Sequence, residues 1–388
     1  MAGRGIRIIS VVGTRPEAIK MAPVATALAA RPGLDHRILL TGQHEGLAGH
    51  FDVAAGLVRQ LDYDPRGRTM RGLRESLRAL LSDRFRRQRI DLVLVQGDTA
   101  SAIAGARAAR DCGIPVGHVE AGLRSFDLRR PFPEEGHRIA IDRVAELLFA
   151  PTEEAARNLR EEARVRGIVL VTGNTGIDAL LRTRERLEPR RPAVDPRRLV
   201  LVTCHRRENH GPPVRAVCDA VKRIVAELPL RVVVALHPNR HVRRAVEEAL
   251  AGTAHVELAE PLGYEEMVRL MDESWLILSD SGGLQEEAPA LGTPLLVLRD
   301  VTERPEAVAS GNIALVGTDT ACIVAAVARL LASPEDHAQM ARPALPFGDG
   351  RASERIADAV EAWASSPRPS SAGRAAAPAL QAPRPGAR

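Results

Sequence analysis

Aromatic side chains are scarce in this chain of 388 residues, which has only two Trp, two Tyr and six Phe. Proteins that bind single-stranded nucleic acid stack the bases on aromatic side chains, so this scarcity argues against such a role. The net charge of +5 does not reverse the argument, because the basic residues are interspersed with acidic ones, as on solvated helix surfaces. We therefore expect no nucleic-acid partner.

Cysteine is also sparse. The four cysteines, Cys112, Cys204, Cys218 and Cys322, form no C-x-x-C pair, which argues against a disulfide framework and a zinc knuckle. No acidic triad suggests another metal site. The first apolar run, Ile8–Val12, is too short for a signal peptide, and no run approaches the roughly 20 apolar residues that span a bilayer. We expect a cytoplasmic protein without a membrane segment or a bound metal.

Lysine is nearly missing from the chain, and the glycine motif G-x-G-x-x-G does not follow its first predicted strand. Only Lys20 and Lys222 are lysines among 54 basic residues, so a retained lysine is mildly informative because lysine and arginine are not interchangeable. Lys222 falls on a predicted exposed helix face, whereas Lys20 follows the first predicted strand and turn. No G-x-G-x-x-G follows that strand, so a tightly held dinucleotide cofactor is not expected.

Short apolar runs alternate with helical patterns through both halves of the chain, which indicates βαβ units and parallel sheets. The length exceeds one ordinary core, so two domains are expected. We predict two Rossmann-like, doubly wound α/β domains, residues 1–178 and 179–350, with a ligand cleft between them. Residues 181–198 have the composition of a linker. The tail, 365–388, has no acidic residue and is expected to be disordered.

The most informative stretch is Val95–Arg138. Two predicted strands, Asp91–Val95 and Ile114–Val119, are followed by the carboxylates Asp98 and Glu120, and Glu134 stands with Glu135 in the next loop. The carboxyl ends of parallel strands form the ligand crevice of such sheets. Several acids in one crevice suit proton transfer and are a poor way to build a core.

Two strand–turn–helix segments have the features of anion sites. Residues 13–17, GTRPE, fit a capping box that also offers a helix N-terminus with Arg15 and Lys20 nearby. In the second half, Ser281, Gly282 and Gly283 follow a predicted strand and could approach a phosphate. Glu287, one turn into that helix, is placed to bind ribose hydroxyls. Each segment could also be a capped or tight turn alone.

Three further polar residues, Arg304, His205 and Gln43, follow predicted strands. Arg304 could grip a diphosphate with both guanidinium nitrogens, or form an ordinary surface salt bridge. His205, next to Arg206 and Arg207, suits an acid or an anion ligand, although a lone histidine is more often structural. Gln43 could line the cleft or merely finish a loop.

Taken together, the strings GTRPEAIKMAP, VQGDTAS, GHVEAGLRS, PFPEEGHR, VTGNTGIDAL, CHRREN, DSGGLQEEAP and TERPEA resemble the non-hydrolysing UDP-N-acetylglucosamine 2-epimerases, in order, over roughly Arg7–Trp363. The resemblance implies a fold like that of GT-B glycosyltransferases, in which a C-terminal helix, about 351–364, returns to the first domain. It also implies a homodimer. His137 stands where the family string PEEANR has Asn.

The resemblance implies a reaction in which UDP leaves C1 and a proton leaves C2 of UDP-N-acetylglucosamine. 2-Acetamidoglucal and UDP form, and re-addition then gives UDP-N-acetylmannosamine without a cofactor. Some members bind a second UDP-N-acetylglucosamine as an activator. By this correspondence the catalytic residues are Asp98, Glu120, Glu134 and His205, the UDP contacts are Arg15, Lys20, Ser281, Gly282, Gly283, Glu287 and Arg304, and the activator contacts are Gln43 and Arg207.

The residues leave other functions open. A related enzyme could epimerise another UDP-2-acetamido sugar, such as a 2,3-diacetamido uronic acid. A GT-B glycosyltransferase would share the diphosphate grip without needing three acids around C1 and C2. A hydrolysing epimerase would release N-acetylmannosamine and UDP. A non-catalytic nucleotide-sugar sensor would have no reason to keep the acids and the histidine together.

Overall fold

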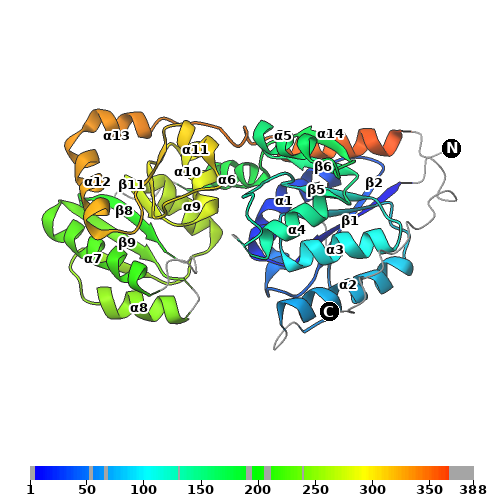
Figure 1. Cartoon of the computed structure of the whole chain (residues 1–388), viewed down its shortest axis with the longest axis horizontal. Coiled ribbons are helices and arrows are strands. Elements are labelled where there is room, and N and C mark those ends of the chain that lie inside the picture. Colours follow the sequence, from blue (N-terminus) through cyan, green and yellow to red (C-terminus); the bar gives the residue numbers. More distant parts are fainter. Residues whose placement is uncertain are drawn as a thin grey trace, which may run out of the picture.

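The computed structural model describes residues 5–51, 56–64, 69–129, 132–188, 195–204, 211–237 and 240–366, with only the main chain at 240 and 241. Two α/β units lie side by side (Figure 1). Among the described residues, no helix is both long enough and apolar enough to cross a membrane.

The first unit is built on a parallel sheet in the order β3-β2-β1-β4-β5-β6-β7. Its strands alternate with helices along the chain, as the sequence predicts. The elements are β1 (Ile6–Val12), α1 (Arg15–Ala29), β2 (Leu34–Leu40), the 3₁₀ turn η1 (Leu47–His50), β3 (Val58–Gln60), α2 (Met70–Arg86), β4 (Leu92–Gln96), α3 (Ala100–Asp111), β5 (Val116–Val119), α4 (Glu134–Asp142), β6 (Leu147–Ala150), α5 (Glu153–Glu161), β7 (Ile168–Val171) and α6 (Thr175–Arg186).

The second unit has a parallel sheet in the order β10-β9-β8-β11-β12-β13. In both sheets the order reverses direction beside the first strand of the unit, and such a switch point opens a crevice at the carboxyl ends of the strands. The elements are β8 (Arg198–Thr203), α7 (Pro212–Glu227), β9 (Leu230–Ala235), α8 (Arg240–Leu250), β10 (Val256–Ala259), α9 (Tyr264–Glu273), β11 (Leu276–Ser279), α10 (Gly282–Leu291), β12 (Leu295–Val297), α11 (Pro305–Ala309), β13 (Ile313–Leu315), α12 (Thr320–Ala332), α13 (Pro334–Met340) and α14 (Ala352–Ser365).

Apolar side chains cover both faces of each sheet. The central strands, such as β4 with LVLVQ, are buried along their whole length, as expected for parallel strands with helices on both faces. In the first unit, α2, α3 and α5 pack on one face and α1 on the other. In the second, α7, α8 and α12 lie opposite α6, α9 and α10. This is the doubly wound architecture that the sequence predicts.

The last helix crosses back to the first unit. Ile356, Val360 and Trp363 of α14 belong to the same buried cluster as residues of α1 and β1, and Figure 1 shows α14 with the first unit, far from α13. The boundary that we predict at 178/179 falls inside α6, which packs against helices of both units, so that boundary stays a prediction. The predicted tail begins at 365, but Ser365 is the last residue of α14. The described residues end at 366, so the rest of the tail lies outside them.

The two segments that connect the units run together. The N–H of Asn174 donates to the carbonyl oxygen of Phe347 at 2.7 Å. Beside this bond, Gly173 and Gly348 have φ of +92° and +122°. A Cβ on Gly173 would lie 3.3 Å from the Cα of Gly348. Glycine is required here both for the backbone conformation and for the close approach.

Candidate active site

A cleft of about 1370 Å³ lies between the two units. Ionisable side chains from both sheets line it: Asp98, Glu134 and Arg138 from the first unit, and Arg299, Glu303 and Arg304 from the second. These residues follow strand ends or begin helices, which is where the topology places a crevice. The structure therefore brings two of the predicted acids and the predicted arginine to one cavity.

Asp98 stands between β4 and the N-cap of α3. Arg138 Nη2 donates to Asp98 Oδ2 at 2.6 Å, and burial, which lowers the pKa of Arg138, is outweighed by Asp98 and other carboxylates, so that the pKa is raised. An arginine that cannot lose its proton holds the carboxylate in one orientation. Sequence analysis did not single out Arg138, although it closes the string PFPEEGHR.

Glu120 follows β5 in a left-handed conformation, with φ of +67°. A non-glycine residue with positive φ costs free energy, and such strain is concentrated at functional sites. Lys20 Nζ lies 2.7 Å from Glu120 Oε2, and Gln96 Nε2 donates to the same oxygen. Glu120 therefore holds the lysine of α1 at the carboxyl edge of the sheet.

Glu286 of α10 links the two units through buried ion pairs. Its Oε2 lies 3.2 Å from Lys20 Nζ and accepts from Asn174 Nδ2 at 2.8 Å. Its Oε1 accepts from Arg304 Nε at 2.7 Å. Burial, which raises the pKa of Glu286, is outweighed by Lys20 and Arg304, so that the pKa is lowered. The string GGLQEEAP does not by itself indicate which of its two glutamates is the buried acid.

Arg304 packs tightly at the start of α10. Burial lowers its pKa, but Glu286 and Glu303 outweigh that effect and raise it. A Cβ on Gly282 would lie 2.9 Å from the guanidinium carbon, so this position admits glycine alone while Arg304 stays in place. The salt bridge weighed for Arg304 in the sequence is present, but it is buried and part of the cleft.

Glu134 begins α4 with its carboxyl group near the cleft. Its Oε2 is buried and has no hydrogen-bond partner among the residues that the structure describes. The neighbouring Glu135 behaves differently, because its Oε1 accepts from the N–H groups of Ser125 and Phe126, each at 3.1 Å. Glu135 therefore orders the loop before α4. A buried carboxyl oxygen without a partner is a group that calls for a functional explanation.

Glu287 lies in the second turn of α10. Tyr264 Oη donates to Glu287 Oε1 at 2.9 Å. Burial raises the pKa of Glu287 to about 7, against the lowering effect of the Tyr264 bond, and burial and Glu287 together raise the pKa of Tyr264 well above its ordinary value. Ser281 is the N-cap residue of α10, and Gly283 is exposed in an otherwise buried first turn.

The anion site predicted after β1 is a junction between the units. Arg15 Nη2 donates to the carbonyl oxygen of Leu262 at 3.1 Å. The carboxylate of Glu17 accepts from the N–H of Thr14 at 2.7 Å, a contact of the predicted capping box. Gln43 Oε1 accepts from Ser101 Oγ at 2.8 Å on the same sheet edge, and its role in binding a second nucleotide sugar stays a prediction.

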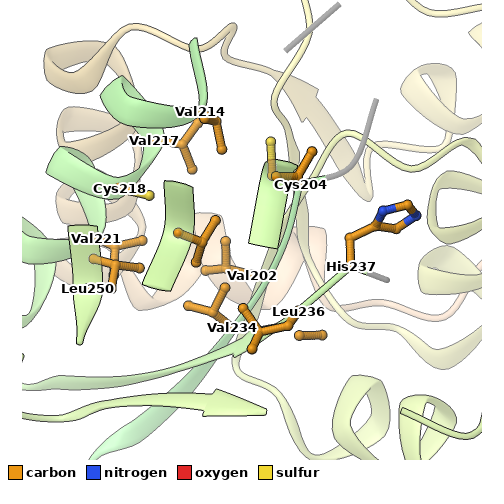
Figure 2. A pocket seen from close by; sticks show the side chains of 13 residues that line it. Val202, Cys204, Val214, Val217, Cys218, Val221, Val234, Leu236, His237 and Leu250 are labelled. Carbon is orange, nitrogen blue, oxygen red and sulfur yellow. The ribbon is translucent and has the colours of Figure 1, made fainter. Parts of the chain in front are cut away.

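Two predicted site residues, His205 and Arg207, lie outside the described residues. Within the part of the chain that the structure describes, no group of three or more His, Cys, Asp and Glu side chains could hold a metal ion. A second cavity, under β8 and β9, is apolar and only about 10 Å³ in volume, lined mainly by Val and Leu with Cys204 and Cys218 (Figure 2). That volume is about one water molecule, so this cavity offers no substrate site.

Comparison with known proteins agrees with this geometry. The family model described as UDP-N-acetylglucosamine 2-epimerase matches residues 26–361. The UDP-N-acetylglucosamine 2-epimerase of Escherichia coli K12 is 40% identical over 374 residues, which cover 92% of this chain and 98% of that protein.

Solved structures give the same result. The Neisseria meningitidis UDP-GlcNAc 2-epimerase bound to UDP-GlcNAc has a TM-score of 0.84 at 36% identity, covering 92% of this chain and 100% of that one. The S. aureus MnaA–UDP co-structure has a TM-score of 0.85 at 37% identity, covering 92% and 97%. The calicheamicin glycosyltransferase CalG4 shares the fold, with a TM-score of 0.58 at 16% identity, as the predicted GT-B-like architecture requires. The chain thus belongs to the UDP-N-acetylglucosamine 2-epimerase family.

Proposed function

We propose that this chain interconverts UDP-N-acetylglucosamine and UDP-N-acetylmannosamine by anti elimination of UDP and its re-addition to 2-acetamidoglucal. One observation carries the proposal: the cleft between the units has carboxyl groups, Asp98 and Glu134, on one wall and Arg304 on the other. Proton transfer at C2 needs the acids, and departure of UDP from C1 needs the cation.

The elimination step uses Asp98 as the base. Its carboxylate takes the proton from C2, the electron pair of that C–H bond becomes the C1=C2 double bond, and the C1–O bond breaks with its pair on the departing diphosphate. Asp98 suits this role better than Glu120 because Asp98 is among the residues that line the cleft. Lys20 and Arg304 then neutralise the charge that develops on UDP.

The return step uses Glu134. Its carboxyl group gives a proton to the opposite face of C2 while UDP re-forms the bond to C1, which inverts the configuration at C2. Because one acid gains a proton and the other loses one, both must exchange with water before the next turnover. The hydrogen at C2 of the product therefore comes from solvent.

On this proposal Ser281 and Gly283 offer the N-terminus of α10 to the diphosphate. Glu287 lies one turn further along α10, where it can receive the ribose, and Tyr264 of α9 donates a hydrogen bond to it. The reaction moves no electrons between molecules, so the proposed chemistry needs no redox cofactor.

The test is proton NMR of UDP-N-acetylglucosamine with the purified protein in deuterium oxide. Formation of UDP-N-acetylmannosamine with deuterium at C2 and no added nucleotide cofactor supports the proposal. Free N-acetylmannosamine as product would show hydrolysis instead. Absence of exchange at C2 would contradict the proposal and direct the search to other UDP-2-acetamido sugars or to sugar transfer.

A further inference from the structure

Two histidines hold consecutive carbonyl groups beside the proposed base. His118 Nε2 lies 2.8 Å from the carbonyl oxygen of Gly97, and His137 Nδ1 lies 2.7 Å from that of Asp98. A carbonyl oxygen can only accept, so the ring nitrogen donates in each case. Gly97 has φ of +64°, so this turn is not an extension of either neighbouring element.

The protonation of His137 follows from its second contact. Its Nε2 lies 2.6 Å from Arg74 Nη1 of α2. A guanidinium only donates, so Nε2 must accept, and the ring is the neutral Nδ1–H tautomer. Burial lowers the pKa of His137, which also favours the neutral ring. The charged groups that face this ring are Arg74, Asp98 and Glu134.

The hydrogen bond from His137 to the carbonyl oxygen of Asp98 matters because His137 lies on α4, the helix that also carries Glu134. His137 and Arg138 are successive residues of α4, and they bind the main chain and the carboxylate of Asp98 respectively. Glu134 stands three and four residues earlier on the same helix, where side chains share a face. The bond from His137 therefore ties the loop of one proposed acid to the helix of the other.

We propose that His137 is a positioning residue for the epimerisation proposed above: Arg74 fixes its tautomer, and His137 fixes the main chain at Asp98. The spacing between the two acids on either side of C2 then depends on this bond. This inference rests on the proposed function, because it assigns His137 to the turnover step and not to UDP binding. A displacement of about 1 Å at a reacting group can lower a rate by about 100-fold.

The experiment compares three variants that keep different parts of the ring. In His137→Asn the amide nitrogen takes the place of Nδ1 and still donates to Asp98. His137→Gln places its amide near Nε2, within reach of Arg74 only, and His137→Ala keeps neither contact. We expect kcat within about threefold of wild type for the Asn variant and at least about tenfold lower for the Gln and Ala variants. KM and the Kd of UDP should change less than about twofold in all three.

The outcomes separate the possible errors. If the wild-type protein shows no exchange at C2, the proposed function fails before this inference is tested. If the wild type is active and His137→Asn is as slow as His137→Ala, the hydrogen bond to Asp98 does not position the base. If the Gln and Ala variants turn over as fast as wild type, or lose UDP affinity in step with kcat, a positioning role is also overturned. Thermal unfolding of each variant identifies a loss that comes from misfolding, and the Gln variant, which retains the contact to Arg74, guards against that case.

Discussion

Replacing Glu286 by Gln tests the ion-pair cluster between the two units. All four contacts described for its carboxylate come from donors: Arg304 Nε and Nη2 at Oε1, and Lys20 Nζ and Asn174 Nδ2 at Oε2. A glutamine has one acceptor oxygen and one NH₂ group, so in either orientation its NH₂ faces donors. The substitution keeps the size of the side chain and removes its charge.

The expected cost is large because both partners are buried cations. Removing one partner of a buried ion pair costs about 3–5 kcal/mol. The lower end of that range applies here, because Lys20 keeps its bond to Glu120 and Arg304 keeps its pairing with Glu303. In a domain of 150–250 residues, 1 kcal/mol lowers the unfolding midpoint by about 2–4 °C, so a loss of about 3 kcal/mol corresponds to roughly 6–12 °C. The diphosphate of UDP can replace the missing negative charge, so UDP should restore part of this loss.

Calorimetry at pH 8, with and without UDP, measures both effects, and Glu287→Gln is the matched control. Burial raises the pKa of Glu287 to about 7. The stability that comes from this raised pKa is complete below the ordinary value of 4.5 and is lost as the pH rises through 7. At pH 8 the control therefore loses at most about 1 kcal/mol, the value of the hydrogen bond from Tyr264, which the glutamine carbonyl oxygen can still accept.

Two results would refute the reasoning. If the free energies of unfolding of Glu286→Gln and Glu287→Gln differ by less than about 1 kcal/mol, the buried ion pairs of Glu286 contribute less to stability than their burial implies. If UDP raises the midpoint of Glu286→Gln no more than that of the wild type, the diphosphate does not lie against Lys20 and Arg304.

Three further predictions concern binding and turnover. Asp98→Asn should lower kcat by at least about 100-fold and leave UDP affinity nearly unchanged by titration calorimetry, because only proton transfer is lost; near-normal turnover would remove Asp98 from the mechanism. Arg304→Ala should raise the Kd of UDP about 10–100-fold, the scale of one charged hydrogen bond, and an unchanged Kd would show that the diphosphate binds elsewhere. The ratio of the UDP affinity of the wild type to that of Glu287→Gln should rise with pH, because ribose hydroxyls donate to an ionised carboxylate. With a pKa of about 7, the ionised fraction of Glu287 grows from about one tenth at pH 6 to about nine tenths at pH 8. The affinity ratio should therefore change by up to about tenfold. A ratio that stays flat across this range would take Glu287 away from the ribose.

The sequence predicts the central strands β4 and β5 as Asp91–Val95 and Ile114–Val119, within two residues of their bounds in the structure. Strands buried on both faces are continuous apolar runs and are therefore recognisable. The sequence does not predict the two edge strands, β3 (Val58–Gln60) and β7 (Ile168–Val171). The sequence of β3, VRQ, has no apolar run, whereas β7, IVLV, has one that the sequence analysis leaves unassigned. The predicted linker at 181–198 was wrong in its first part, because α6 continues to Arg186. The arginines and glutamates that suggest a linker are the exposed side of that helix.

Part of the candidate site also follows from the sequence. Strand ends place Asp98 and Glu120 on one edge of the sheet, since parallel strands share that edge. Glu286 could not be recognised, because its partner Lys20 is 266 positions away in the chain. Only the packing of two separate sheets against each other brings a pair with that separation together.

The paired crossings at Gly173 and Gly348 constrain how the molecule can open. A single connecting segment would let the units rotate about several axes. Two connecting segments joined by the Asn174–Phe347 hydrogen bond restrict that rotation to an axis through the crossings. Displacement grows with distance from that axis. Asn174 also binds Glu286, so the ion-pair cluster lies beside these crossings. We expect that any opening of the cleft moves this cluster less than it moves the exposed Phe126 and Val301, which line the cleft.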